Sequence, residues 1–123
     1  MPKNIVGMRV QLTIEEDGTD NPPSLPLGTV VRRLIGTDRN DYYAVRLDRS
    51  VTCIRATTGR PWTLHELVVV TSDVGTSLEV LKHRGKAAIW VGVMNLLVPI
   101  GQEDPMLDFS KGEYFAIGWI RRA

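Results

Sequence analysis

The sequence predicts a single all-β domain, and three observations support this. Hydrophobic side chains recur at every second position, as in residues 9–14, where Val10, Leu12 and Ile14 alternate with polar residues. A period of two is typical of a strand with one buried face. Groups of turn-forming residues separate such segments, and the segments are rich in β-branched residues, which favour strands. With 123 residues, the chain is long enough for one hydrophobic core.

The first half is expected to contain five strands. A long loop over residues 15–27 follows the first strand, because this stretch contains Pro22, Pro23 and Pro26. The last apolar run, Leu67–Val70, is too short for a helix and is predicted to be a buried closing strand. The five strands are expected at residues 9–14, 29–35, 42–48, 51–56 and 67–70. The turns between the later strands are expected at residues 36–41 and 57–61.

The second half is expected to add a β-hairpin and a terminal strand. Gly85, in His83-Arg84-Gly85, supplies the positive φ that a tight turn needs. The segment 87–98 is long enough for a helix, but its β-branched residues favour extended structure. The hairpin arms are expected at residues 78–82 and 86–93, and the segment 87–98 is expected to form one long strand or two consecutive strands. A second long loop is expected at residues 101–112, and the terminal strand at residues 113–121.

Large aromatic side chains of the second half are expected to build the core that joins it to the first half, because such side chains dominate burial. These residues are Trp90, Phe109, Tyr114, Phe115 and Trp119. If Ala87–Val98 is an edge strand, its backbone must be covered by another chain or segment. A homo-oligomer formed through this edge is therefore a further hypothesis.

The order of features in the first half resembles the SH3-like small barrels, which include SH3, Tudor, CAP-Gly and KOW domains. A glycine precedes the first strand (Gly7-Met8-Arg9-Val10), and a proline-bearing loop leads to Gly28-Thr29-Val30-Val31. The run Tyr42–Asp48 is similar to the third strand of Tudor and KOW domains. The resemblance implies a barrel over residues 6–71, with residues 76–123 packed on it as a C-terminal β-extension of one domain, 1–123.

The functions best known in these families find little support in the residues. The first loop, residues 15–27, lacks the aromatic pair of peptide-binding SH3 domains, and the Gly-Lys-Asn-Asp-Gly signature of CAP-Gly domains is absent. A Tudor-type cage needs several converging rings, and only Tyr42, Tyr43 and Trp62 lie in this half. The resemblance therefore carries an expectation of fold more than of function.

Composition narrows the classes of function further. Fifteen basic residues against fourteen acidic ones give a net charge of +1, which disfavours a dedicated nucleic-acid binder because phosphate contacts dominate such binding. The longest apolar stretch, Ala87–Val98, is too short to cross a bilayer, and no signal-peptide core follows Met1. The single cysteine excludes an intramolecular disulfide. A cytoplasmic protein without membrane contact is expected.

No catalytic, cofactor-binding or metal-binding residues are predicted, and whether the protein is an enzyme stays open with a leaning against it. No HxH, CxxC or HExxH spacing occurs. Cys53 is interpreted as a small core hydrophobe. A small enzyme is the second alternative function, and it requires Cys53, His65 or His83 to meet a loop carboxylate in one pocket.

The most suggestive residues combine arginine with aromatic rings on neighbouring strands. Such a face suits protein–protein hot spots or stacking of single-stranded nucleic acid, although cross-strand pairs of these residues also simply stabilise sheets. The candidate binding face comprises Arg32, Arg33, Tyr42, Arg46, Arg55, Arg60 and Trp62. The favoured function is a non-catalytic module that binds a protein partner through this face or an exposed β edge. The alternative is a barrel that binds single-stranded nucleic acid.

Overall fold

The computed structural model describes residues 5–14, 24–35, 42–54, 59–72, 78–83, 88–96 and 112–123. This part of the chain holds eight strands and one 3-10 helix. The strands are β1 (Arg9–Ile14), β2 (Ser24–Leu34), β3 (Tyr42–Leu47), β4 (Val51–Ile54), β5 (Pro61–Leu64), β6 (Leu67–Ser72), β7 (Ile89–Leu96) and β8 (Gly112–Arg122). The 3-10 helix is η1 (Leu78–Lys82).

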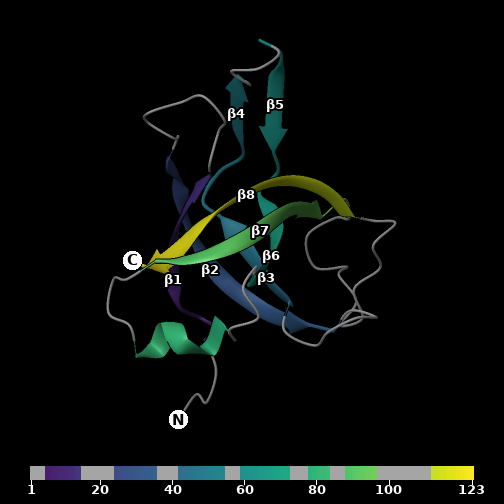
Figure 1. Cartoon of the computed structure of the whole chain (residues 1–123). Helices are drawn as coiled ribbons and strands as arrows, with labels where there is room; N and C mark the ends of the chain where they lie inside the picture. The colour runs from purple at the N-terminus through teal and green to yellow at the C-terminus, as the bar shows by residue number, and fades with distance from the viewer. Residues whose placement is uncertain are drawn as a thin grey trace.

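Six strands form a closed barrel in which every neighbouring pair is antiparallel. The order is β1-β2-β3-β6-β7-β8, and β8 pairs with β1 to close the wall. In Figure 1 the long arcs of β7 and β8 cross in front of β2 and β3. The all-β prediction is confirmed, and the closed barrel fits a small SH3-like architecture.

The second half of the chain completes the wall of this barrel. β7 pairs with β6 on one side and with β8 on the other. The segments expected to pack on a barrel of residues 6–71 thus supply two of the six barrel strands. From Val91 to Asn95, β7 has hydrogen-bonded neighbours on both sides, so the unpaired edge assumed for the homo-oligomer hypothesis does not exist over these residues.

Two expectations about the elements are wrong, one on where β2 begins and one on the structure of residues 78–82. β2 begins at Ser24, inside the segment 15–27 that was predicted to be a loop. Pro26 is tolerated there because the β1–β2 pairing is irregular at this point, where the register shifts between Gln11 and Thr13, and proline is found in strands mainly at such irregularities. Residues 78–82, predicted as a hairpin arm, form the 3-10 helix η1 instead.

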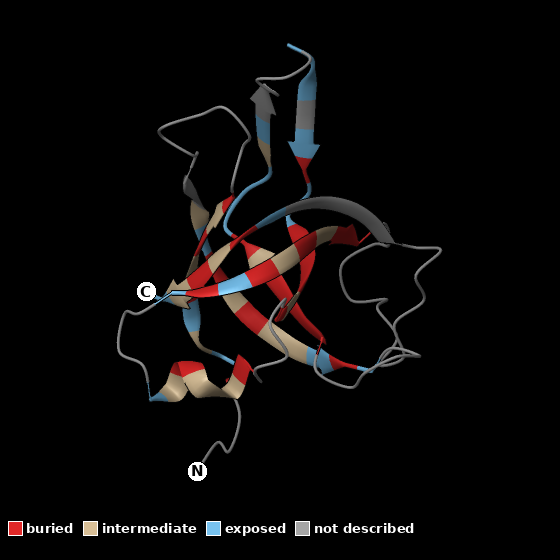
Figure 2. Ribbon diagram, viewed as in Figure 1, coloured by how far each residue is buried: buried red, intermediate tan, exposed pale blue. Residues whose placement is uncertain are grey.

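The helix η1 forms because its apolar residues are three apart rather than two. Leu78 and Leu81 come to one side of a helix with three residues per turn, and both are fully buried in the main core. η1 lies beneath the barrel in the view of Figure 2, with its buried residues shown in red. The side chain of Glu79 accepts hydrogen bonds from the Tyr43 hydroxyl and from the Ile5 N–H, which fixes η1 to the barrel end.

Alternate residues of the strands build two separate apolar clusters. Inward-facing side chains fill the barrel, and the cluster that they form contains Val10, Leu12, Ile14, Val30, Tyr43, Val45, Leu47, Val68, Val70, Val91, Val93 and Ile120, among others. A second cluster uses the opposite face of the wall, and its buried members are Leu34, Tyr42, Ala44, Leu67, Val69 and Leu96. Residues 42–45 of β3 are consequently buried on both faces.

β4 and β5 form a two-stranded sheet of their own that projects from the barrel at the top of Figure 1. β5 was not predicted, because Pro61 was assigned to a turn. Asn95, a fully buried polar residue of β7, ties the base of this hairpin to the wall. Its Oδ1 accepts from the His65 N–H at 2.7 Å, and its Nδ2 donates to the Thr63 carbonyl at 3.1 Å.

Among the described residues, no helix has the length and apolar character that crossing a membrane requires.

Candidate functional site

The structure spreads the arginine–aromatic face expected from the sequence over distant parts of the molecule. Tyr42 and Arg32 do lie on the outer face of the barrel, where Tyr42 is opposite Leu34 and Arg32 is opposite Ala44. However, Tyr42 is only 4% exposed, within the outer apolar cluster. Its ring therefore has no face open for a base or a partner side chain.

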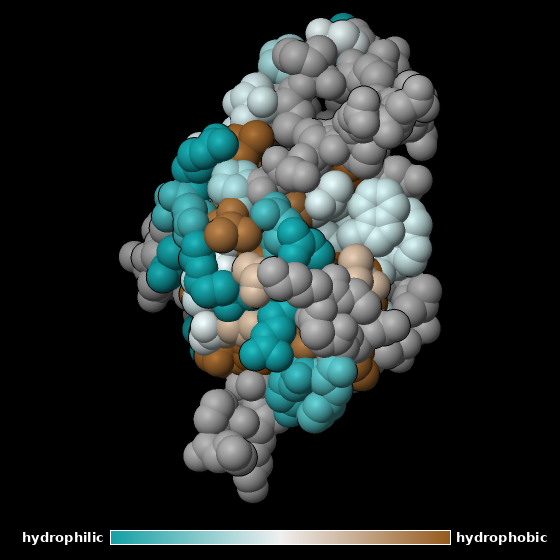
Figure 3. Space-filling view, turned by 90° about the vertical axis from the view of Figure 1, so that its left-hand side faces the viewer, coloured by the Kyte–Doolittle hydropathy of each residue, from teal (hydrophilic) through white to brown (hydrophobic). Residues whose placement is uncertain are grey.

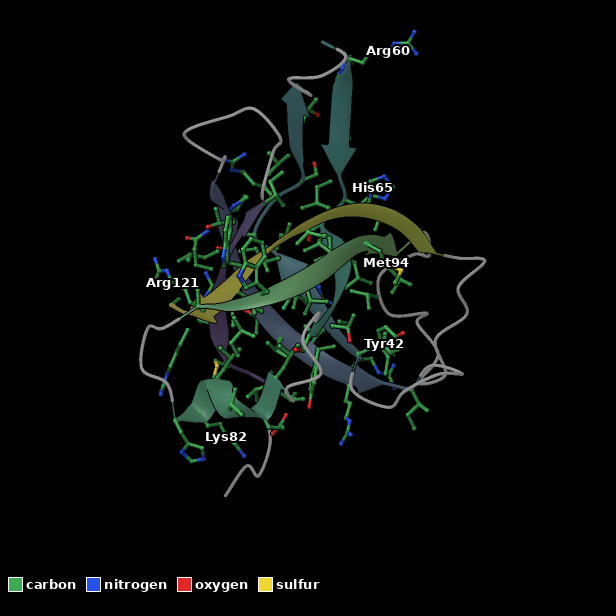
Figure 4. The ribbon with its side chains drawn as sticks, viewed as in Figure 1. Tyr42, Arg60, His65, Lys82, Met94 and Arg121 are labelled. Carbon is green, nitrogen blue, oxygen red and sulfur yellow. The ribbon has the colours of Figure 1, made fainter. Side chains whose placement is uncertain are left out.

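The remaining members of that face are scattered. Arg46 is half-buried, and its Nε is buried without a hydrogen-bond partner. Arg33 is exposed at the β2 position opposite Tyr43. Arg60 is exposed just before β5 and lies at the far end of the projecting hairpin from Tyr42, as Figure 4 shows. Arg55 lies outside the described residues, as does the side chain of Trp62.

The residues of the enzyme hypothesis do not form a site in the described part of the chain. His65 is exposed after β5, and His83 is exposed after η1; these elements lie on opposite sides of the barrel in Figure 1. The side chain of Cys53 is outside the described residues. Within the described ranges, no group of three or more histidine, cysteine, aspartate or glutamate residues could hold a metal ion.

Two tryptophans instead form an exposed pair on the outer wall of the barrel. Trp90 of β7 is directly opposite Trp119 of β8. Their ring centroids are 4.4 Å apart and the ring planes are tilted by 40°. Trp90 is 38% exposed, and Trp119 is half-buried. The expectation that both residues belong to the core is therefore wrong.

The alternation of β7 and β8 explains this outcome. Ile89, Val91 and Val93 take the inward positions of β7, so Trp90 must point outward. On β8 the inward positions go to Gly118 and Ile120, both buried. On β7 this alternation is visible in the sequence and could have placed Trp90 on the outer face. On β8 it is not, because Phe115, Ile117 and Trp119 form the more apolar of the two alternating sets.

Ile117 extends the exposed pair along β8. It is 36% exposed and lies opposite Gly92, which has no side chain and has open space above it. We call Trp90, Ile117 and Trp119 the tryptophan patch. The outward positions of the adjoining strand β1 carry Arg9, Gln11 and Thr13, and the outward position after Trp119 is Arg121. No acidic residue occupies the described outward positions of β1, β7 and β8 that border the patch.

A hollow of about 510 Å³ lies near the other end of β1 and β8. The chain segments that line it are the turn before β1, the end of η1 and the end of β8. The described lining residues are Ile5, Val6, Gly7, Met8, Arg9, Lys82, Arg122 and Ala123.

The turn that forms one wall of this hollow is well defined. The Met8 N–H donates to the Ile5 carbonyl at 3.0 Å, and Gly7 has a φ of 93°. A positive φ at the third position is typical of a type II turn, which favours glycine there. The Gly7 N–H donates to the Val30 carbonyl at 2.7 Å, so the turn is attached to β2.

Arg9 is held in place beside the same hollow. Its guanidinium binds the Asp48 carboxylate through both terminal nitrogens, at 2.9 and 2.7 Å, and it also donates to the Thr29 hydroxyl at 2.9 Å. The hydrogen bond from Arg9 lowers the pKa of Asp48 below its ordinary value, and the same bond raises the pKa of Arg9.

No protein-family model, curated protein or solved structure matches this chain.

Proposed function

We propose that the protein is a non-catalytic binding module that contacts a protein partner through the tryptophan patch. The observation that carries this proposal is the exposed Trp90–Trp119 pair on the outer wall of a closed barrel. Tryptophan and arginine are enriched among the few residues that dominate binding energy at protein interfaces. Ile117 and Arg121 adjoin the pair, so an apolar anchor has a basic neighbour.

The arrangement of the two rings favours a protein over single-stranded nucleic acid. A base stacks on an open ring face, but Trp90 and Trp119 pack against each other with centroids 4.4 Å apart. What they offer is the rest of the indole surface beside the aliphatic side chain of Ile117, which suits an apolar side chain of a partner. The net charge of +1 also gives little of the electrostatic attraction on which nucleic-acid binding depends.

From the resemblance of the third strand to Tudor and KOW domains, this proposal takes only the barrel architecture and not the binding site of those domains. Tyr43 is buried inside the barrel, and Tyr42 is buried in the cluster on the opposite face. These two rings therefore do not converge on an exposed cage, and the tryptophan patch would be the binding surface. The single cysteine fits a cytoplasmic location, where disulfides are rare.

The proposal is tested by affinity capture from native extract, with and without nuclease. The baits are the wild-type protein, Trp90→Ala, Ile117→Glu and the control Ile35→Ala. Ile35 is 43% exposed and directly follows β2, so the control removes an exposed apolar side chain elsewhere. Ile117→Glu places a charge in the patch without opening a core cavity, and circular dichroism checks that every bait is folded.

We expect the wild type and Ile35→Ala to retain the same protein partner, whereas both patch variants lose it. Truncating a hot-spot residue costs about 2 kcal/mol or more, which is roughly a thirty-fold loss of affinity. If Trp90→Ala and Ile117→Glu retain the partner as the wild type does, the patch is not the binding surface. Capture that disappears after nuclease treatment would replace the proposal with nucleic-acid binding.

A further inference from the structure

We infer that the hollow between the turn at Ile5–Met8, the end of η1 and the end of β8 binds an acidic peptide segment. This site is separate from the tryptophan patch and does not depend on the proposed function. Its volume of about 510 Å³ lies in the range of about 300–1,000 Å³ that is typical of ligand pockets. In Figure 3 hydrophilic side chains lie beside hydrophobic ones on the side of the molecule that carries the C-terminal end of β8.

Among the described lining residues, the side chains that carry charge are all basic, namely those of Arg9, Lys82 and Arg122. The acids Asp48 and Glu79 lie next to the first two of them. The three basic residues come from three different elements, β1, η1 and β8. Several carboxylates spaced along a peptide can reach cations distributed in this way, whereas a single small anion would meet only some of them.

Two of these cations are positioned by acids that lie outside the described lining. Arg9 is fixed by both oxygens of Asp48, and Lys82 lies 3.4 Å from Glu79. A guanidinium has five N–H donors, so binding Asp48 and Thr29 leaves Arg9 with further donors. Holding these side chains in place reduces the entropy that a ligand must otherwise overcome when it orders them.

Arg122 is the third cation, and it is exposed. Its backbone carbonyl accepts from Arg121. Among the described residues, no hydrogen bond or ion pair joins its guanidinium to another group. A planar guanidinium fork matches a carboxylate bidentately, so Arg122 is the group expected to contribute most directly to recognition.

The rest of the lining is apolar, which indicates a ligand with both acidic and apolar side chains. Val6 is 39% exposed and Met8 is half-buried beside it, so these two side chains form the apolar wall, whereas Ile5 is buried in the main core. A peptide that alternates glutamate and leucine can place carboxylates on the cations and an aliphatic side chain on this apolar wall. The chemistry that recognises the ligand is thus a combination of charge and apolar contact.

The test is an NMR titration of the full ¹⁵N-labelled chain at low salt. The probe is the acetylated, amidated peptide Glu-Leu-Glu-Leu-Glu, and a second arm uses the matched peptide Gln-Leu-Gln-Leu-Gln. Inorganic phosphate forms a third arm. We expect the acidic peptide alone to produce saturable shifts in the amides of Gly7, Met8, Lys82 and Arg122.

Three variants accompany the titration. Arg122→Ala and Lys82→Ala are each expected to weaken binding of the acidic peptide about five-fold, since an exposed ion pair contributes up to about that much. Arg60→Ala, which removes an exposed arginine at the distant hairpin, should leave the affinity unchanged. Amide spectra of the variants that overlay the wild type away from the substitution show that the fold is intact.

Four results would overturn the inference. Equal shifts with the glutamine peptide would show an apolar hollow without charge recognition. Saturation by phosphate with the same shifts would indicate a site for a free anion. An equal loss in Arg60→Ala would indicate nonspecific attraction. Unchanged affinity in both Arg122→Ala and Lys82→Ala would place the peptide elsewhere.

Discussion

Gly118 allows a sharp test of how β8 closes the barrel. An added Cβ at this position would lie 2.2 Å from the Thr13 carbonyl oxygen and 3.0 Å from the Ile14 Cα. Both atoms belong to the backbone of β1, so no side-chain rotation can relieve the overlap. Overpacking costs typically about 1–3 kcal/mol and occasionally more. For Gly118→Ala we expect the free energy of unfolding to fall by about 3 kcal/mol, which is the upper end of this range, or by more.

Urea unfolding followed by circular dichroism measures this loss, and Gly92→Ala is the matched control. Gly92 lies on β7 opposite Ile117, and its added Cβ would meet nothing within 4 Å. The free energy of unfolding of Gly92→Ala should lie within about 0.5 kcal/mol of the wild-type value or rise slightly, because alanine restricts the unfolded chain. For a chain of this size the expected loss in Gly118→Ala corresponds to a fall in Tm of roughly 12 °C.

If the free energy of unfolding of Gly118→Ala lies within about 1 kcal/mol of the wild-type value, the close approach of β8 to β1 is refuted. An equal loss in both variants would refute it as well, since the cause would then be the general effect of replacing a strand glycine.

Three further predictions concern polar contacts. Asn95→Leu should lower the free energy of unfolding, measured with urea, by about 2–3 kcal/mol, because the His65 N–H and the Thr63 carbonyl lose their partner. Thr63→Val keeps this carbonyl and is the control, so an equal loss in that variant would contradict the explanation. Tyr43→Phe should cost about 1.5 kcal/mol by the same assay, since a hydrogen bond to the Glu79 carboxylate is removed, and an unchanged midpoint would rule out that contact. Because the folded-state pKa of Asp48 lies below its ordinary value of 3.8, its contribution is present above that value and is lost as pH falls through the lower folded-state pKa. The stability difference between the wild type and Asp48→Asn should therefore shrink on acidification, and a difference that is constant from pH 7 to pH 2 would argue against the Arg9 pairing.

Sequence reasoning succeeded where one periodicity dominated. Val10, Leu12 and Ile14 alternate with polar residues, and β1 is found at the expected residues 9–14. Tyr42–Leu47 and Leu67–Ser72 are strands close to the expected bounds. Alternation and short β-branched runs are local signals, so they identify strands without knowledge of their partners.

It failed where a tertiary contact outweighed the local signal. Residues 78–82 were predicted to be a hairpin arm next to a turn at Gly85, which lies outside the described residues, but burial of Leu78 and Leu81 at the barrel end stabilises a 3-10 helix there. Pro26 indicated a loop, yet the irregular register beside it admits proline into β2. Neither the packing of η1 on the barrel end nor the register between β1 and β2 can be deduced from residues that are neighbours in the sequence.

The candidate site was also missed for a physical reason. Large aromatics were assigned to the core by their size, although alternation puts Ile89 and Val91 inside and Trp90 outside. On β8 the inward position next to Trp119 is Gly118, where an added Cβ would overlap the backbone of β1. The expected arginine–aromatic face assumed that strand neighbours share one exposed surface, but Tyr42 is buried by the outer cluster.

The pairing of β1 with β8 has a consequence for how the chain reaches its native state. β1 ends at Ile14 and β8 begins at Gly112, so the contacts between these two strands close a very long loop of the chain. Proteins rich in such distant pairings fold slowly, in milliseconds to seconds. During synthesis on the ribosome, β1 emerges long before its partner and presents an unpaired edge that other chains can join. We therefore expect nascent chains that lack β7 and β8 to depend on chaperones.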